Sequence, residues 1–234
     1  MANTPSGFSA EIGKSVFRGV ALGTLVLALL ANWGARKGWV HIPLPQIPNG
    51  VPWFTSRALG FTAYAALTLD VIVGLLLSTT LGDRLVSRAR ALDLHRFVSV
   101  SALALTALHA VMLLADTYVV FTPIDLLVPF ASTYRPAAVG AGSIALYTAL
   151  LVHVSFDLQK RIGTRVWRAL HALSFVSYVA ATFHGLSAGT SSSQGFAKMV
   201  YGSSLALVMW LVFYRLSALS KVQTAPAGLR RESA

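Results

Sequence analysis

LDLHRFVSVSALALTALHAVML, residues 92–113, and RVWRALHALSFVSYVAATFHGLSAG, residues 165–189, are the two stretches that decide the fold. Each is apolar over about the 20 residues that a helix needs to cross a bilayer. Each also carries two histidines, 14 residues apart in the first stretch and 13 in the second: His95 and His109, then His171 and His184. An ionisable side chain inside a membrane is costly, and a functional role is its default explanation. The two stretches therefore predict two membrane helices with paired functional histidines.

The composition of the whole chain indicates an integral membrane protein. Of its 234 residues 55% are hydrophobic and only 12% are charged, whereas soluble domains carry about 25% charged residues. We predict an all-α, six-helix membrane bundle (14–219) between an N-terminal tail (1–13) and a C-terminal tail (220–234). The predicted spans are 14–33, 57–80, 93–116, 136–157, 164–188 and 195–216.

The connections and the amino terminus fit this topology. The 33–56 connection is rich in glycine and proline and is predicted to be a loop, and the 117–135 connection is too short and interrupted to span, so we expect it at the interface. No small-residue cleavage site follows the first apolar run, so we expect a retained helix rather than a signal peptide. The chain has no cysteine, which excludes disulfides and thiolate metal sites.

The basic residues predict the orientation. The net charge is +11, and Lys and Arg concentrate in the 81–92 and 158–168 loops and the C-terminal tail. Such an excess marks the cytoplasmic side, so both termini are predicted to be cytoplasmic, in a bacterial-type inner membrane surrounded by lipid. We attribute the charge to this rule and expect no nucleic-acid partner. The basic segment 82–92 is interpreted as a solvated loop, rather than a membrane-surface segment or a docking site for a donor.

The histidines fall at two depths. With the predicted helices running the same way, His95 and His171 lie near the cytoplasmic end, and His109 and His184 lie about 20 Å further out at 1.5 Å per residue. Each pair is then placed to hold one haem iron from two sides. Fourteen residues make close to four turns, but thirteen leave the second pair roughly 100° or more out of register. The helix therefore either deviates locally or approaches its two haems from different angles.

These two stretches resemble the third and fifth helices of the ferric reductase-like transmembrane family over about residues 55–190. That family includes ferric reductases, NADPH oxidases and the haem-binding membrane subunit of the bacterial methionine sulfoxide reductase system. The resemblance implies that the chain is a haem-containing transmembrane oxidoreductase. It implies two haem b groups, with iron ligands at His95, His109, His171 and His184.

The chain departs from the oxidases of that family because no strand–GxGxxG–helix pattern for a nucleotide fold is present. We therefore expect electrons from a separate flavin reductase or from quinol, and an outer-side acceptor such as a ferric chelate, oxygen or a periplasmic protein. One alternative is a haem subunit that feeds a periplasmic reductase. Alternatives of another class are a proton or ion transporter and a haem sensor without turnover.

Further polar and aromatic residues are weaker candidates. Haem propionates are anionic, which suits arginines, and Arg57 resembles the arginine near the family's outer haem. Asp70 would make a polar contact or take part in proton transfer, with the polar contact favoured, and His153 is a speculative ligand or quinone-site residue for which packing is favoured. Phe175 and Tyr178 are interpreted as packing residues rather than a bridge between haems. The candidate propionate contacts are Arg57, Arg96, Arg165 and Arg168.

Overall fold

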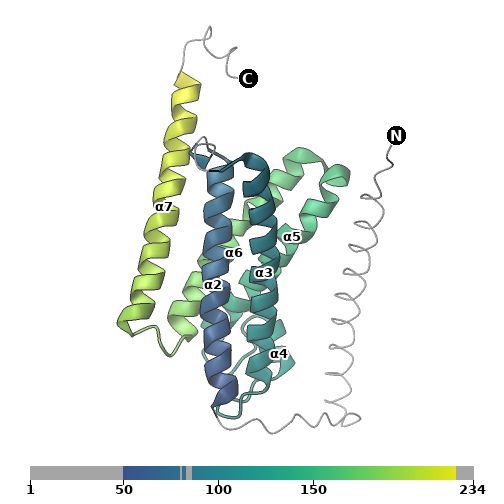
Figure 1. Cartoon of the computed structure of the whole chain (residues 1–234). Helices are drawn as coiled ribbons and strands as arrows, with labels where there is room; N and C mark the ends of the chain where they lie inside the picture. Colours follow the sequence, from purple (N-terminus) through teal and green to yellow (C-terminus); the bar gives the residue numbers. More distant parts are fainter. Residues whose placement is uncertain (1–49, 80, 83–85, 225–234) are drawn as a thin grey trace, which may run out of the picture. The chain divides into compact units, whose positions relative to one another are not determined.

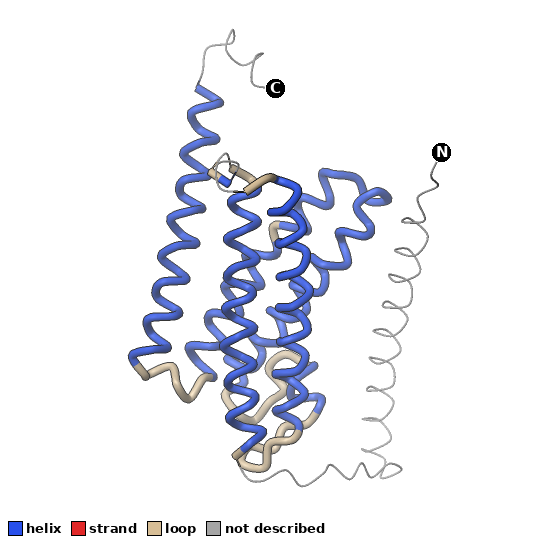
Figure 2. The backbone as a smooth tube through the Cα atoms, in the orientation of Figure 1, coloured by secondary structure: helices blue, strands red, loops and turns tan. Residues whose placement is uncertain are grey.

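The computed structural model describes residues 50–79, 81–82 and 86–224, with side chains to residue 218, and this part of the chain is helical without strands (Figures 1 and 2). Four of its helices are long and apolar enough to cross a membrane. The predicted span 14–33 and the C-terminal residues 225–234 lie outside the described residues. The helices are α2 (Val51–Leu77), α3 (Arg88–Leu114), α4 (Pro123–Leu127), α5 (Pro136–His171), α6 (Leu173–Ala188) and α7 (Gly195–Thr224).

Helices α2 and α3 form an antiparallel hairpin (Figure 1). Ser56 near the start of α2 contacts His109 near the end of α3, and Asp70 further along α2 contacts His95 near the start of α3. The register between the helices is therefore constant over about four turns, and each histidine of α3 faces a polar residue of α2.

The helical stretch Pro136–Ala188 is 53 residues long and doubles back on itself. A straight helix of that length would extend about 80 Å, far beyond the ~30 Å hydrocarbon core of a bilayer. The helix breaks at Gly163, where φ is 78° and ψ is 159°. Beyond the break the chain runs antiparallel, since Ser177 donates to the carbonyl of Ala145 at 2.8 Å and His184 contacts that of Ala138. The two arms correspond to the predicted helices 136–157 and 164–188.

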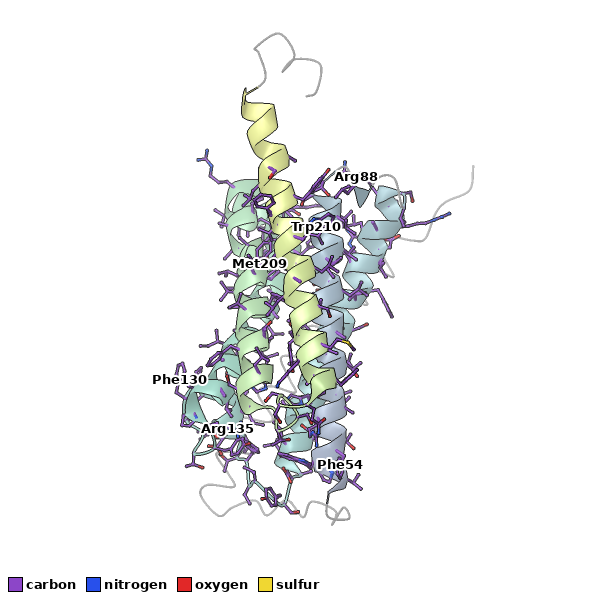
Figure 3. The ribbon with its side chains drawn as sticks, turned by 90° about the vertical axis from the view of Figure 1, so that its left-hand side faces the viewer. Phe54, Arg88, Phe130, Arg135, Met209 and Trp210 are labelled. Carbon is purple, nitrogen blue, oxygen red and sulfur yellow. The ribbon has the colours of Figure 1, made fainter. Side chains whose placement is uncertain are left out.

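Helix α7 packs against α2 and α6 through an apolar core that contains several tyrosines. Tyr64 of α2 stacks on Tyr178 of α6 with ring centres 6.0 Å apart, and the Tyr178 hydroxyl lies 2.6 Å from that of Ser204 on α7. Met209 and Trp210 lie on the opposite, exposed face of α7 (Figure 3). Hydroxyls inside an apolar bundle need partners, and this network satisfies them while joining three helices.

Much of the apolar surface of the described helices is exposed rather than packed. In the most apolar 18 residues of α3 only 11% are buried, and Phe97 is 70% exposed. Soluble proteins rarely expose continuous apolar faces of this size. Exposed apolar faces on long helices are what a lipid environment requires, so the structure supports the membrane class that the composition predicts.

Several predicted boundaries are wrong by a few residues. Helix α2 begins at Val51 rather than at 57, because Pro52 lies in the first turn, where a missing N–H costs no helical hydrogen bond. Helix α3 begins at Arg88 rather than 93, so part of the predicted basic loop is its first turn. Helix α7 continues past 216 to Thr224, into the predicted C-terminal tail, since a helix satisfies its own backbone on either side of a membrane boundary.

The 117–135 connection contains one short helix, α4, which ends well short of a span as predicted. Thr122 caps it: the backbone N–H of Asp125 donates to the Thr122 hydroxyl, and the Asp125 carboxylate accepts from the backbone N–H of Thr122. The connection then packs on α5, where Ser143 donates to the carbonyl of Leu126 at 2.7 Å.

Gly163→Ala should destabilise the fold, because φ 78° with ψ 159° lies in a region that is essentially restricted to glycine. We expect a loss of about 1–3 kcal/mol, measured as a lower thermal unfolding midpoint in detergent. Gly202→Ala is the matched control, because Gly202 lies inside α7 with nothing within 4 Å of an added Cβ. An alanine there is neutral or stabilising. Equal effects of the two changes would contradict the turn at Gly163.

Candidate functional site

The four predicted histidines lie in two facing pairs, between α3 on one side and the returning arm formed by the end of α5 and α6 on the other. The ring centres of His95 and His171 are 6.2 Å apart, and those of His109 and His184 are 6.1 Å apart. The rings of each pair are steeply inclined, at 71° and 78°. The pairing predicted from the spacing is the pairing in the structure.

Backbone carbonyls hold the second pair. Nδ1 of His109 lies 2.7 Å from the carbonyl oxygen of Ser56, and Nδ1 of His184 lies 2.8 Å from that of Ala138. Each carbonyl can only accept, so each Nδ1 carries the hydrogen and each Nε2 is left as the basic nitrogen. Histidines that ligate metals are almost always oriented by such a contact at the other nitrogen.

A carboxylate contacts the first pair instead. Nδ1 of His95 lies 2.8 Å from Oδ1 of Asp70. The two atoms are close enough for an ion pair but are not aligned as a hydrogen bond, and neither has a hydrogen-bond partner within the described residues. Burial of both atoms favours this contact, because a polar atom shielded from water needs a partner. Nδ1 of His171 also lacks a hydrogen-bond partner there, and the ring of Trp167 stacks on His171 at 5.0 Å.

Glycines on neighbouring helices leave room for three of the four imidazoles. A Cβ added to Gly60 would lie 3.1 Å from Nδ1 of His109, and one added to Gly74 would lie 3.3 Å from Cε1 of His95. A Cβ at Gly142 would lie 2.7 Å from Nδ1 of His184, which is closer than nonbonded atoms approach. The glycines therefore form cradles that larger side chains would fill.

Helix α2 repeats one pattern at the two levels of α3. Ser56 is followed by Gly60 and Asp70 by Gly74, so a polar residue and then a glycine recur at the 14-residue spacing of the histidines. In each unit the polar residue contacts Nδ1, and a Cβ at the glycine would meet the same imidazole ring. Ser56, Gly60 and Gly74 were missed in the sequence, and Asp70 was named without its partner, although the shared spacing is a signal that could have found them.

The geometry of the pairs fits a metal held between two imidazoles. With metal–nitrogen bonds of about 2 Å on both sides, the two ring centres would lie about 6 Å apart, as they do in both pairs. Within the described residues no cluster of three or more His, Asp or Glu is placed to hold a metal ion alone.

A cavity adjoins the second pair. It extends along α2 from the level of Asp70 to the loop that follows α6, and its walls are mostly apolar. The concave, mostly apolar form with few polar groups is typical of small-molecule and cofactor sites. The polar residues that line it include Arg57, Asp70, His109, His184, Thr190 and Ser191.

The other predicted residues separate into those near the pairs and those outside them. Arg57 lies at the cavity wall, with its guanidinium 5.9 Å from the ring centre of Phe54. Arg96 lies over the Phe156 ring at 5.3 Å, so its guanidinium is engaged there. Arg165 and Arg168 are exposed on the arm that carries His171. Their contacts with haem propionates stay predictions.

Asp70 makes the polar contact that was favoured for it, and its partner is His95. His153 on α5 lies outside both pairs. Tyr178 is 2% exposed and belongs to the core shared with α2 and α7, against which Phe175 packs. The packing interpretation of both aromatic residues is confirmed.

The awkward 13-residue spacing coincides with a local irregularity. The α-helix is interrupted at Ala172, directly after His171. There the backbone N–H of Phe175 bonds to the carbonyl of Ala172 at 3.1 Å, which is the tighter, three-residue pattern of a 3₁₀ turn. A 3₁₀ turn rotates the chain further per residue than an α-helix does. The irregularity therefore reduces the angle about the helix axis that separates His171 from His184.

The chain matches no family model, no curated protein and no solved structure. The ferric reductase-like resemblance of the two histidine stretches therefore stays a prediction.

Gly142→Ala should displace the His184 ring, because the added methyl would lie 2.7 Å from Nδ1. Overpacking of this kind costs about 1–3 kcal/mol, and we expect a correspondingly lower unfolding midpoint. Gly74→Ala, whose methyl would meet His95 at 3.3 Å, should have a smaller effect. A larger effect at Gly74 than at Gly142 would contradict the packing described here.

Proposed function

We propose that this protein carries electrons across a membrane through two b-type haems, one held by His95 and His171 and the other by His109 and His184. The observation that carries the proposal is the pair of facing imidazoles at two levels, with ring centres 6.2 and 6.1 Å apart. Three of the four also have Nδ1 held by an oxygen, which leaves Nε2 as the metal ligand.

The proposal needs both arms of the Pro136–Ala188 stretch to cross the membrane, together with a first span at 14–33 and cytoplasmic termini. Two features support this topology: the reversal at Gly163 and the basic residues at one end. Arg88 and the exposed Arg165 and Arg168 belong to the end of the His95–His171 pair, which we assign to the cytoplasmic side. Figure 3 shows Arg88 at one end and Phe54 and Arg135 at the other.

When bound, the haems supply one-electron redox chemistry. The residues of the chain would hold the two haems at fixed depths and surround them with apolar helices, and oxygens of α2 and α5 orient three of the four imidazoles. His95 and His171 would hold the inner haem and His109 and His184 the outer one, and a bound pair would supply one-electron transfer between the two levels. Such a path crosses a medium that electrons otherwise cross poorly.

The donor and acceptor follow from the two ends. A flavin reductase or a quinol is the donor class for the cytoplasmic end, and the basic residues there suit an acidic donor surface. At the other end Arg57, which lies in the wall of the cavity beside His109 and His184, suits an anionic acceptor such as a ferric chelate. A periplasmic reductase as acceptor would make the chain a membrane subunit of a larger system.

The purified protein should show a b-type reduced-minus-oxidised spectrum with about two haems per chain, since each pair supplies two axial ligands. Replacing any one of the four histidines with alanine should remove about one haem, and His153→Ala should remove none. Pyridine haemochrome quantification gives the count.

Two results would overturn the proposal. If the purified wild-type protein contains no haem, the buried histidines and Asp70 serve in proton transfer or in packing instead. Retention of both haems by His109→Ala and also by His184→Ala would refute the pairing.

A further inference from the structure

The two histidine pairs differ in the charge of the group that holds them. Both imidazoles of the His109–His184 pair contact neutral backbone carbonyls, at 2.7 and 2.8 Å. In the His95–His171 pair, His95 contacts the Asp70 carboxylate at 2.8 Å, and His171 has no hydrogen-bond partner at Nδ1 among the described residues. The repeated polar–glycine pattern of α2 thus places a carboxylate at one level and a neutral group at the other.

The strength of the contacts at Nδ1 does not by itself distinguish the His95–His171 pair from the His109–His184 pair. A charge-assisted contact is roughly twice as strong as a neutral one, and the second pair has two neutral contacts against one charged contact in the first. The negative charge decides the difference, because it acts on the charge of the bound metal as well as on the imidazole.

Cations near the first pair oppose this charge only weakly. Among the described residues, Arg96 on α3 acts electrostatically on His95 and Arg215 on α7 acts on His171. The Arg96 side chain is 56% exposed, and its guanidinium lies over Phe156. The Asp70 side chain is 15% exposed. A charge shielded from water acts more strongly at a given distance than an exposed one, so the carboxylate dominates the field at His95.

We propose that Asp70 sets the direction of electron flow, by lowering the reduction potential of the haem held by His95 and His171 below that of the haem held by His109 and His184. This inference rests on the proposed function. Asp70 acts through His95 as a positioning residue: the carboxylate makes the imidazole a stronger electron donor and stabilises the ferric form of the iron it binds.

The order of potentials has a direct consequence for transfer. Transfer of an electron from the lower-potential haem to the higher-potential haem has a favourable free-energy change. The reverse transfer is unfavourable by the same free energy. The path is thereby biased from the cytoplasmic end toward the cavity end, although both sites use two imidazoles.

Asp70→Asn tests the proposal, because asparagine keeps the size and an acceptor oxygen but removes the charge. In a spectroelectrochemical titration of the purified haem protein, we expect the lower of the two midpoint potentials to rise by about 59 mV. This shift corresponds to a tenfold change in the reduction equilibrium of a one-electron couple. The higher midpoint should stay in place. Asp125→Asn is the matched control: it also removes a carboxylate, but one whose contacts are with Thr122 at the start of α4 rather than with either histidine pair, so it should move neither midpoint.

Two outcomes would overturn the proposal while leaving the haem assignment intact: an unchanged lower midpoint in Asp70→Asn with both haems bound, or an equal shift of both midpoints. If Asp70→Asn loses haem, two other variants decide. His184→Ala keeps the first pair and should show the lower potential, and His171→Ala keeps the second pair and should show the higher one; the opposite order refutes the inference. Failure of the proposed function is distinct, since it appears as absence of haem from the wild-type protein.

Discussion

The structure depends on one constraint: an imidazole inside an apolar helix bundle needs a partner for each of its ring nitrogens. Three of the four histidines meet this requirement at Nδ1 through oxygens that belong to other helices. The ring centres of each pair are 6.2 and 6.1 Å apart, a separation that suits a metal between two imidazoles. The helix contacts that position these oxygens, between α2 and α3 and between the two arms that meet at Gly163, are therefore the contacts that make the site.

Close helix approach is the second condition, and glycine supplies it. Gly60 and Gly74 bring α2 against α3, and Gly142 brings α5 against α6, each beside an imidazole. Small residues at helix contacts are usual in membrane bundles, where association relies on close packing rather than on exclusion of water. Here the same glycines serve packing and the site together, because the space that they leave is occupied by histidine rings.

The histidine pairs could be predicted from the sequence, because spacing along a helix fixes depth, and the 14-residue spacing of His95 and His109 also fixes their common face. Their partners could not, since the register of α2 on α3 depends on side-chain packing that one sequence does not reveal. The 14-residue recurrence from Ser56 and Gly60 to Asp70 and Gly74 was nevertheless a usable signal. Helix starts were misplaced where a proline was taken as a loop signal; Pro52 instead lies in a first turn, where it is tolerated. A local deviation of this helix was one of two alternatives that the 13-residue spacing left open, and the sequence did not locate the break at Ala172.

Low-temperature electron paramagnetic resonance of the oxidised protein tests the central claim most directly, because it reports the axial ligands of each haem separately. The account predicts two low-spin ferric signals typical of two imidazole ligands, one lost in His171→Ala and the other in His184→Ala. No haem signal in the wild-type protein, or loss of the same signal in both variants, would contradict it.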